Sequence, residues 1–316
     1  MVLNLTGKPT LLVSCTDRKS LTPSRELQLR SISSRNSLEM AAAKWARSLT
    51  LTSGSECREM LRDLYLGEYW KLALTGEEYA DLLIASAGLG LMSPNALAPG
   101  YAATFVAGSP DSIVRFDAKR NPDVVRSDWW ASLASNGLGI KNWTRKTADV
   151  VLVALSNSYQ QALAEDFRKI AQSGKQVIVM SGSRQVAALQ NIENIHHVET
   201  GQWLRMVLGG STPCVGMRFA LRLLSEDKWH SIEEVKAELR SLERRYLQSG
   251  ADKLPVFDRI PQSDAQVKSW ILRLLKIWKT EGMKPSKSGF LREYRNAGFA
   301  CEQKRFGLLY EEALSR

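Results

Sequence analysis

The chain has 316 residues, enough for one large domain or two of modest size. Apolar residues make up 44% and charged residues 24%, which supports a buried core and excludes a wholly disordered chain. The 43 Lys and Arg residues outnumber the 33 Asp and Glu residues, and the net charge is +10. Such an excess is compatible with a polyanionic partner such as nucleic acid, and equally with a basic protein that has none.

The composition also predicts where the protein works. No apolar run approaches the roughly 20 residues of a membrane-spanning helix, and the first residues lack a secretory-signal pattern. The cysteines Cys15, Cys57, Cys214 and Cys301 lie far apart, with no CxxC pair and no histidine at metal-ligand spacing. We therefore expect a reduced, cytoplasmic protein with no metal, no cofactor and no membrane partner.

Four short runs with an apolar interior have the character of buried parallel strands. They span residues 10–15, 81–86, 149–156 and 175–181. Helical periodicity fills the stretches between them, at 38–49, 57–74, 122–136 and 159–173. Strands that alternate with helices predict an α/β fold with a mostly parallel central sheet flanked by helices.

Polar residues follow each predicted strand. They are Ser14 to Lys19, Ser86 to Gly90, Ser156 to Tyr159 and Ser181 to Arg184. Because open α/β sheets bind ligands outside the carboxyl ends of their strands, these four segments predict one shared site. Ser and Gly are also ordinary turn residues, but four such segments together favour a site.

Asp17 is the carboxylate best placed for chemistry, because it comes just after the first strand and beside cations. It can orient and deprotonate a water molecule, or it can instead cap a helix or pair with Arg18 or Lys19. Asn157 is the second candidate catalytic residue: its amide can read a base edge, and Tyr159 can stack on the base. Further candidate binding residues are Ser14, Lys19, Ser86, Tyr101, Ser181 and Arg184.

The composition changes near residue 228, and we expect two domains, 1–228 and 229–316. Ser231 and Glu234 fit a capping box that opens a helix to about residue 247. An amphipathic helix is predicted at 264–280, and two further helices around a Gly-containing turn lie within 286–314. This pattern is typical of a helix-turn-helix that binds nucleic acid, or of a plain helical module. Its candidate DNA-binding residues are Lys287, Arg292 and Arg295.

The segment Leu12-Val13-Ser14-Cys15-Thr16-Asp17-Arg18-Lys19 resembles the strand-plus-"SCxxxK" opening of a bacterial superfamily. That superfamily includes YaaA-type peroxide-stress proteins and glycosylase-like domains that accompany archaeosine synthesis enzymes. Residues 86–94 and 99–101 resemble its second signature, roughly "SAKYGLLxP…PY". The matching residues are Ser14, Cys15, Lys19, Ser86, Gly90, Leu91, Pro94, Pro99 and Tyr101. Gly88, Leu89 and Gly100 depart from the pattern, so the substrate does not transfer directly.

The resemblance covers about residues 10–185 and implies a fold similar to uracil-DNA glycosylase. Some relatives bind DNA, and some are anti-phage DNA glycosylases that remove modified bases. We therefore expect a DNA glycosylase that leaves an abasic site in double-stranded phage DNA, with a lyase step left open. The alternatives are a non-catalytic DNA-binding stress protein, an RNA-directed base-modification enzyme and a hydrolase of free nucleotides.

Overall fold

The computed structural model describes residues 7–51, 57–182, 185–249, 260–280 and 285–315. The chain divides into two compact units, residues 1–251 and 252–316. Each unit has its own apolar core among these residues.

A six-stranded sheet forms the centre of the first unit, with the strand order β4-β3-β1-β6-β7-β8. The strands are β1 (Thr10–Ser14), β3 (Asp81–Ser86), β4 (Gly90–Met92), β6 (Val150–Ala154), β7 (Gln176–Ser181) and β8 (Ile195–Glu199). All neighbours are parallel except β3 and β4. The predicted α/β fold with a mostly parallel sheet is confirmed. The carboxyl ends of β1, β3, β6 and β7 consequently share one edge of the sheet.

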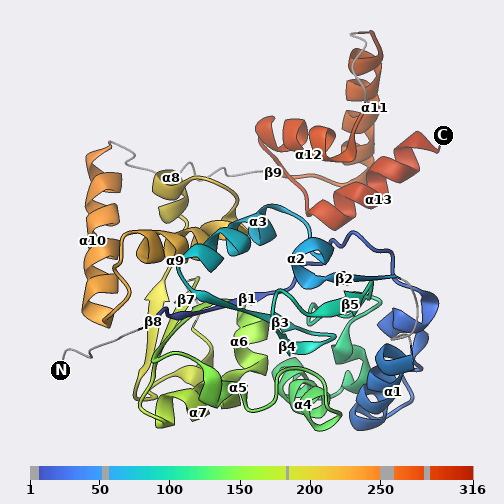
Figure 1. Ribbon diagram of the computed structural model, residues 1–316. Helices are drawn as coiled ribbons and strands as arrows, with labels where there is room; N and C mark the ends of the chain where they lie inside the picture. The colour runs from blue at the N-terminus through green and yellow to red at the C-terminus, as the bar shows by residue number, and fades with distance from the viewer. Residues whose placement is uncertain (1–6, 52–56, 183–184, 250–259, 281–284, 316) are drawn as a thin grey trace. The chain divides into compact units, whose positions relative to one another are not determined.

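Helices cover both faces of this sheet (Figure 1). On one face lie α3 (Glu68–Thr75) and α9 (Val215–Ser225), and on the other lie α4 (Pro122–Ser135), α6 (Asn157–Ala162) and α7 (Ala164–Gln172). The remaining α-helices of the unit are α1 (Leu38–Leu51), α2 (Leu61–Leu64), α5 (Trp143–Lys146), α8 (Leu204–Leu208) and α10 (Ile232–Gln248). Helices on both faces bury the central strands, which explains why the interior of β1 and the whole of β6 are apolar.

The segment 57–74 differs from the single helix that its periodicity predicts. It contains a three-residue strand, β2 (Arg58–Met60), and then α2 and α3. Strand β2 pairs with β5 (Leu97–Pro99) in a small antiparallel sheet. Gly67 separates the helices at φ 113°, a backbone conformation that other residues rarely adopt. Beside this break, the Tyr65 hydroxyl bonds to Tyr101, and the Tyr69 hydroxyl bonds to the backbone of Ser14 and Ala154 at the sheet edge.

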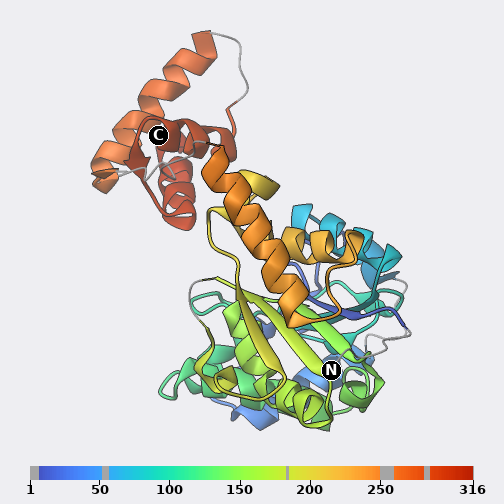
Figure 2. The ribbon, with the colours of Figure 1, turned by 90° about the vertical axis from the view of Figure 1, so that its left-hand side faces the viewer.

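The first unit extends further along the chain than the predicted boundary at 228/229. Helix α10 packs beside α8 (Figures 1 and 2), and the rings of Trp203 and Tyr246 lie 5.9 Å apart. Val235 and Leu242 of α10 are completely buried in the first core. The composition changes before α10, but these apolar contacts hold the helix to the sheet domain and move the division to 251/252.

The second unit contains α11 (Asp264–Thr280), α12 (Lys287–Asn296) and α13 (Gln303–Leu314) among its described residues. Two short parallel strands, β9 (Ile260–Pro261) and β10 (Phe299–Ala300), pair with each other. Strand β10 occupies the connection between α12 and α13, where we expected only a turn. Phe290, Tyr294 and Phe306 form the centre of a separate apolar core. No helix among the described residues is long and apolar enough to cross a membrane.

Candidate functional site

The carboxyl ends of β1 and β6 are in direct contact. These strands are neighbours in the sheet, with Val13 opposite Ala154. Just beyond them, Cys15 Sγ and the Tyr159 hydroxyl oxygen lie 3.1 Å apart. On the other side, the Tyr69 hydroxyl donates to the Ala154 carbonyl and accepts from the Ser14 amide at 3.3 Å. Two strand ends predicted to meet are therefore joined by side chains as well as by the sheet.

Asp17 and Asn157 lie on the two segments that this contact joins. Asp17 follows Cys15 by two residues and is exposed, and Asn157 precedes Tyr159 by two residues and is also exposed. Parallel strands place both residues beyond the same sheet edge. Asp17 is neither buried nor in an ion pair among the described salt bridges, so its carboxylate faces solvent at the expected edge.

Ser86, at the end of β3, is fully buried. Its Oγ accepts from the amides of Gly88 at 3.2 Å and Leu89 at 3.1 Å, and lies 2.6 Å from the Tyr101 hydroxyl. Because both lone pairs of Oγ are engaged, its hydrogen points to Tyr101. Tyr101 in turn donates to the Tyr65 hydroxyl, 2.7 Å away. We expected Ser86 and Tyr101 to be binding residues, but both side chains are buried and support the turn instead.

The turn after β3 is held by two tryptophan side chains. Trp129 Nε1 donates to the Ala87 carbonyl at 2.8 Å, and Trp45 Nε1 donates to the Gly88 carbonyl at 2.6 Å. A Cβ on Gly88 would lie 2.6 Å from Tyr101 Cε2, so glycine is required there. The two tryptophans and the Tyr101 ring therefore hold this turn from two sides.

Lys19 packs its amine over this buried network. Its Nζ lies 4.3 Å from the centre of the Tyr101 ring, a cation–π contact, and 5.7 Å from the centre of the Tyr65 ring. It also donates to the Thr16 carbonyl at 3.0 Å. Burial lowers the pKa of Lys19, while the neighbouring Cys15 and Asp17 act in the opposite direction. The amine therefore braces the loop that carries Asp17.

The tyrosines of this edge stay protonated across the neutral range. Burial raises the pKa of Tyr65, Tyr101 and Tyr159 well above the ordinary value and raises the pKa of Tyr69 to about 12. Tyr159 is half-buried, with its ring edge-to-face against Phe105 at a centroid distance of 4.7 Å. Its hydroxyl is thus a hydrogen-bonding group, and its ring offers partly accessible aromatic surface.

Three further residues were predicted at this edge of the sheet: Ser14, Ser181 and Arg184. Ser14 is half-buried at the end of β1. Ser181, at the end of β7, is buried, and its hydroxyl has no hydrogen-bond partner among the described residues. Arg184 lies outside the described residues. Neither Ser14 nor Ser181 therefore has an exposed hydroxyl at this edge. The side chains of Asp17 and Asn157, in contrast, are exposed.

The three predicted DNA-binding cations all lie on α12 in the second unit. Arg292 is the most exposed, at 73% of its side chain, and lies 3.6 Å from Glu293. Lys287 pairs with Glu311, and Arg295 donates to the Cys301 carbonyl at 3.1 Å. Of the three, Arg292 is therefore the most available to a phosphate.

Four aromatic side chains that support the edge were not predicted from the sequence: Tyr65, Tyr69, Trp45 and Phe105. Tyr65 and Tyr69 lie in a stretch whose periodicity predicts one helix. Gly67, between them, was the signal in the sequence that this helix is interrupted. His196 and His197 lie within β8. Among the described residues, no group of three or more His, Cys, Asp or Glu side chains is placed to hold a metal ion.

Comparison with protein-family models, with curated proteins and with solved structures found no match.

Proposed function

We propose that this protein is a DNA glycosylase that removes a modified base from double-stranded DNA by hydrolysis. The observation that carries the proposal is the contact between Cys15 Sγ and the Tyr159 hydroxyl. It joins the segment that bears Asp17 to the segment that bears Asn157, so an exposed carboxylate and an exposed amide share one edge. A base-excising enzyme needs these two groups, one for water and one for the base.

In the proposed reaction, the target nucleotide leaves the base stack at a cost of a few kcal/mol, about the amount known for flipped bases. Asp17 accepts a proton from the water that attacks C1′ of the sugar. The bond between C1′ and the base nitrogen breaks, and the base leaves with its bonding electron pair and takes up a proton from solvent. The carboxylate also stabilises the positive charge that develops on the sugar. The products are an abasic site and the free base.

Asn157 and Tyr159 contact the base in this scheme. The amide of Asn157 offers one donor and one acceptor group to a base edge. The half-buried ring of Tyr159, fixed by Phe105 and Cys15, offers an aromatic surface for stacking. The net charge of +10 favours association with the DNA backbone.

Lys19 acts as a positioning residue rather than as a nucleophile. Its amine is engaged by the Tyr101 ring and by the Thr16 carbonyl. It therefore holds the loop of Asp17, and a water-driven reaction fits the arrangement better than a lyase. Borohydride added during turnover traps an enzyme–DNA adduct only if an amine attacks the sugar, and we expect no adduct.

The direct test incubates the full-length protein with duplexes that contain unmodified cytosine, 5-hydroxymethylcytosine, glucosylated 5-hydroxymethylcytosine or uracil. Abasic sites are then revealed by an aldehyde-reactive probe. We expect abasic sites in at least one modified duplex and none in unmodified DNA. Tight binding to all duplexes without abasic sites would overturn the proposal and favour a non-catalytic DNA-binding protein. Stronger binding to tRNA than to duplex DNA at matched salt would favour an RNA-directed enzyme.

A further inference from the structure

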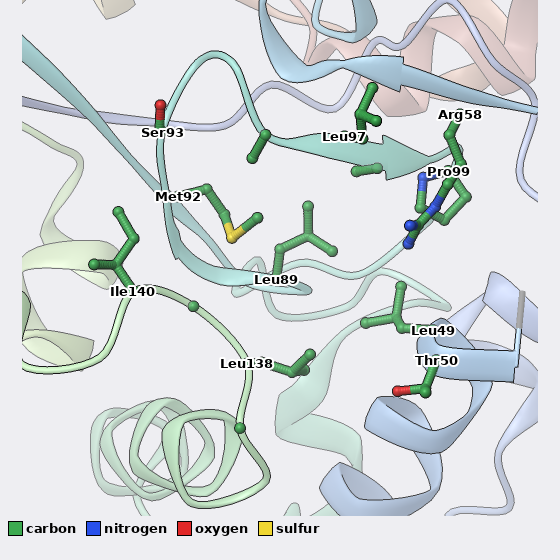
Figure 3. A pocket seen from close by; sticks show the side chains of 14 residues that line it. Leu49, Thr50, Arg58, Leu89, Met92, Ser93, Leu97, Pro99, Leu138 and Ile140 are labelled. Carbon is green, nitrogen blue, oxygen red and sulfur yellow. The ribbon is translucent and has the colours of Figure 1, made fainter. Parts of the chain in front are cut away.

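A cavity of about 410 Å³ lies along β4, the edge strand of the sheet (Figure 3). Its walls come from four places: the end of α1, strand β2, the β3–β5 region and the turn at 137–140 after α4. The volume is within the roughly 300–1,000 Å³ that small-molecule pockets occupy. None of the proposed catalytic residues lines this cavity.

The walls are apolar and their backbone is fixed. Leu89, Met92 and Leu138 point into the cavity in Figure 3, and Ile140 lines its edge. The Ile140 amide donates to the Leu91 carbonyl at 2.8 Å and ties the 137–140 turn to β4. A Cβ on Gly139, which has φ 81°, would lie 2.8 Å from the Leu91 nitrogen, so glycine permits this close approach. The cavity is thus built into the backbone.

Arg58 is the one charged residue among the residues that line the cavity. Its guanidinium lies at one end, between Pro99 and Leu49 (Figure 3). Its Nε is buried and has no hydrogen-bond partner among the described residues. The neighbouring carboxylate, Glu59, accepts from Ser20 instead. A buried N–H without a partner is costly, and a guanidinium matches the geometry of carboxylates and phosphates.

We propose that this cavity binds a small anion with a flat apolar body, whose acidic group reaches Arg58 while its ring system contacts Leu89, Met92 and Leu138. Carboxylates and phosphates share this chemistry. The proposal does not depend on the glycosylase reaction, because the cavity and the Asp17 edge use different residues.

The test measures binding to the full-length protein by calorimetry, with 2-naphthoate, 2-naphthyl phosphate and the neutral 2-naphthalenemethanol as probes. We expect at least one anion to bind tenfold or more tightly than the alcohol, and the tighter anion identifies the acidic group. Arg58→Gln should abolish this preference. Arg47→Gln, an exposed arginine on α1, is the matched control and should preserve it.

A second variant tests anion binding in the cavity without changing Arg58. Leu97 lines the cavity yet is 56% exposed, so Leu97→Asp should leave the fold intact and place a competing carboxylate near Arg58. We expect it to weaken anion binding at least tenfold, with unchanged circular dichroism. Equal binding of the anions and the alcohol, no binding of any probe to the folded protein, or an unchanged preference in Arg58→Gln would overturn the proposal. DNA excision assays on the same variants separate this outcome from failure of the proposed function.

Discussion

Cys15 Sγ and the Tyr159 hydroxyl oxygen lie 3.1 Å apart, although 144 residues separate them in the chain. Their contact joins the loop after β1 to the start of α6 at the carboxyl end of β6. It ties the segment that bears Asp17 to the segment that bears Asn157.

Ser86→Ala removes the oxygen that accepts from the Gly88 and Leu89 amides and donates to Tyr101. The site is fully buried, so these groups lose their partner, and we expect a loss of about 1–3 kcal/mol in the free energy of unfolding. Urea unfolding measures the change. Ser135→Ala, at an exposed position of α4, is the control and should change the free energy little. Equal effects of the two substitutions would contradict the buried network.

Gly88→Ala places a Cβ 2.6 Å from Tyr101 Cε2, within a turn whose carbonyls two tryptophans already hold. Because neither the turn nor the Tyr101 ring can move freely, we expect overpacking to lower the free energy of unfolding by roughly 1–3 kcal/mol. A Cβ at Gly182 meets nothing within 4 Å, and Gly182→Ala is the matched control. Thermal unfolding distinguishes the variants. A melting temperature for Gly88→Ala equal to that of Gly182→Ala would show that the turn is not tightly packed.

The buried amine of Lys19 predicts the direction in which the free energy of unfolding changes with pH. Burial lowers its pKa in the folded protein, so between that value and about 10.4, the ordinary value, the unfolded chain binds more protons. The free energy of unfolding of the wild type, relative to Lys19→Met, should therefore rise as the pH increases through this window. Below the window both states are protonated, and the difference between the proteins stays constant. If the difference in the free energy of unfolding between the wild type and Lys19→Met stays constant or falls up to pH 10, the amine is not buried.

Arg292→Ala tests the contribution of the second unit to DNA binding. The side chain is 73% exposed, and its nearest described carboxylate, Glu293, lies 3.6 Å away. If it contacts a phosphate, its loss should weaken binding to all duplexes alike and reduce the salt slope by about 1. Fluorescence anisotropy at several salt concentrations measures both quantities. Arg120→Ala is the comparison, because Arg120 is held by Asp128 at 2.6 Å and should contribute less. An unchanged slope for Arg292→Ala would exclude this contact.

The sheet could be predicted because it depends on local patterns. Each buried strand is an apolar run with a polar end, and β3 spans residues 81–86 as predicted. The edge strand β4 was missed because it is three residues long and its pairing with β3 is set by the Gly90 turn, at φ 74°. The domain boundary was misplaced because Val235 and Leu242 are buried through contacts distant in sequence.

The candidate site was predictable in position but not in the role of each residue. Parallel topology sufficed to bring the segments of Asp17 and Asn157 together. Whether a serine at a strand end faces solvent depends on which side chains pack over it. Ser86 is covered by Tyr101, and no local pattern in the sequence reveals that contact. Long-range packing therefore decided which residues are exposed at the edge.

The most direct test of the proposed function is single-turnover base release from a modified duplex by wild type, Asp17→Asn and Asp81→Asn. Asp81 is an exposed aspartate at the opposite, amino-terminal end of β3, so it controls for the charge change alone. We predict that Asp17→Asn slows release by roughly 10²–10⁴-fold at unchanged DNA affinity, the usual contribution of an acid–base group, and that Asp81→Asn retains the wild-type rate. Equal rates for Asp17→Asn and the wild type, or no base release by a folded wild type that binds the duplex, would contradict the account.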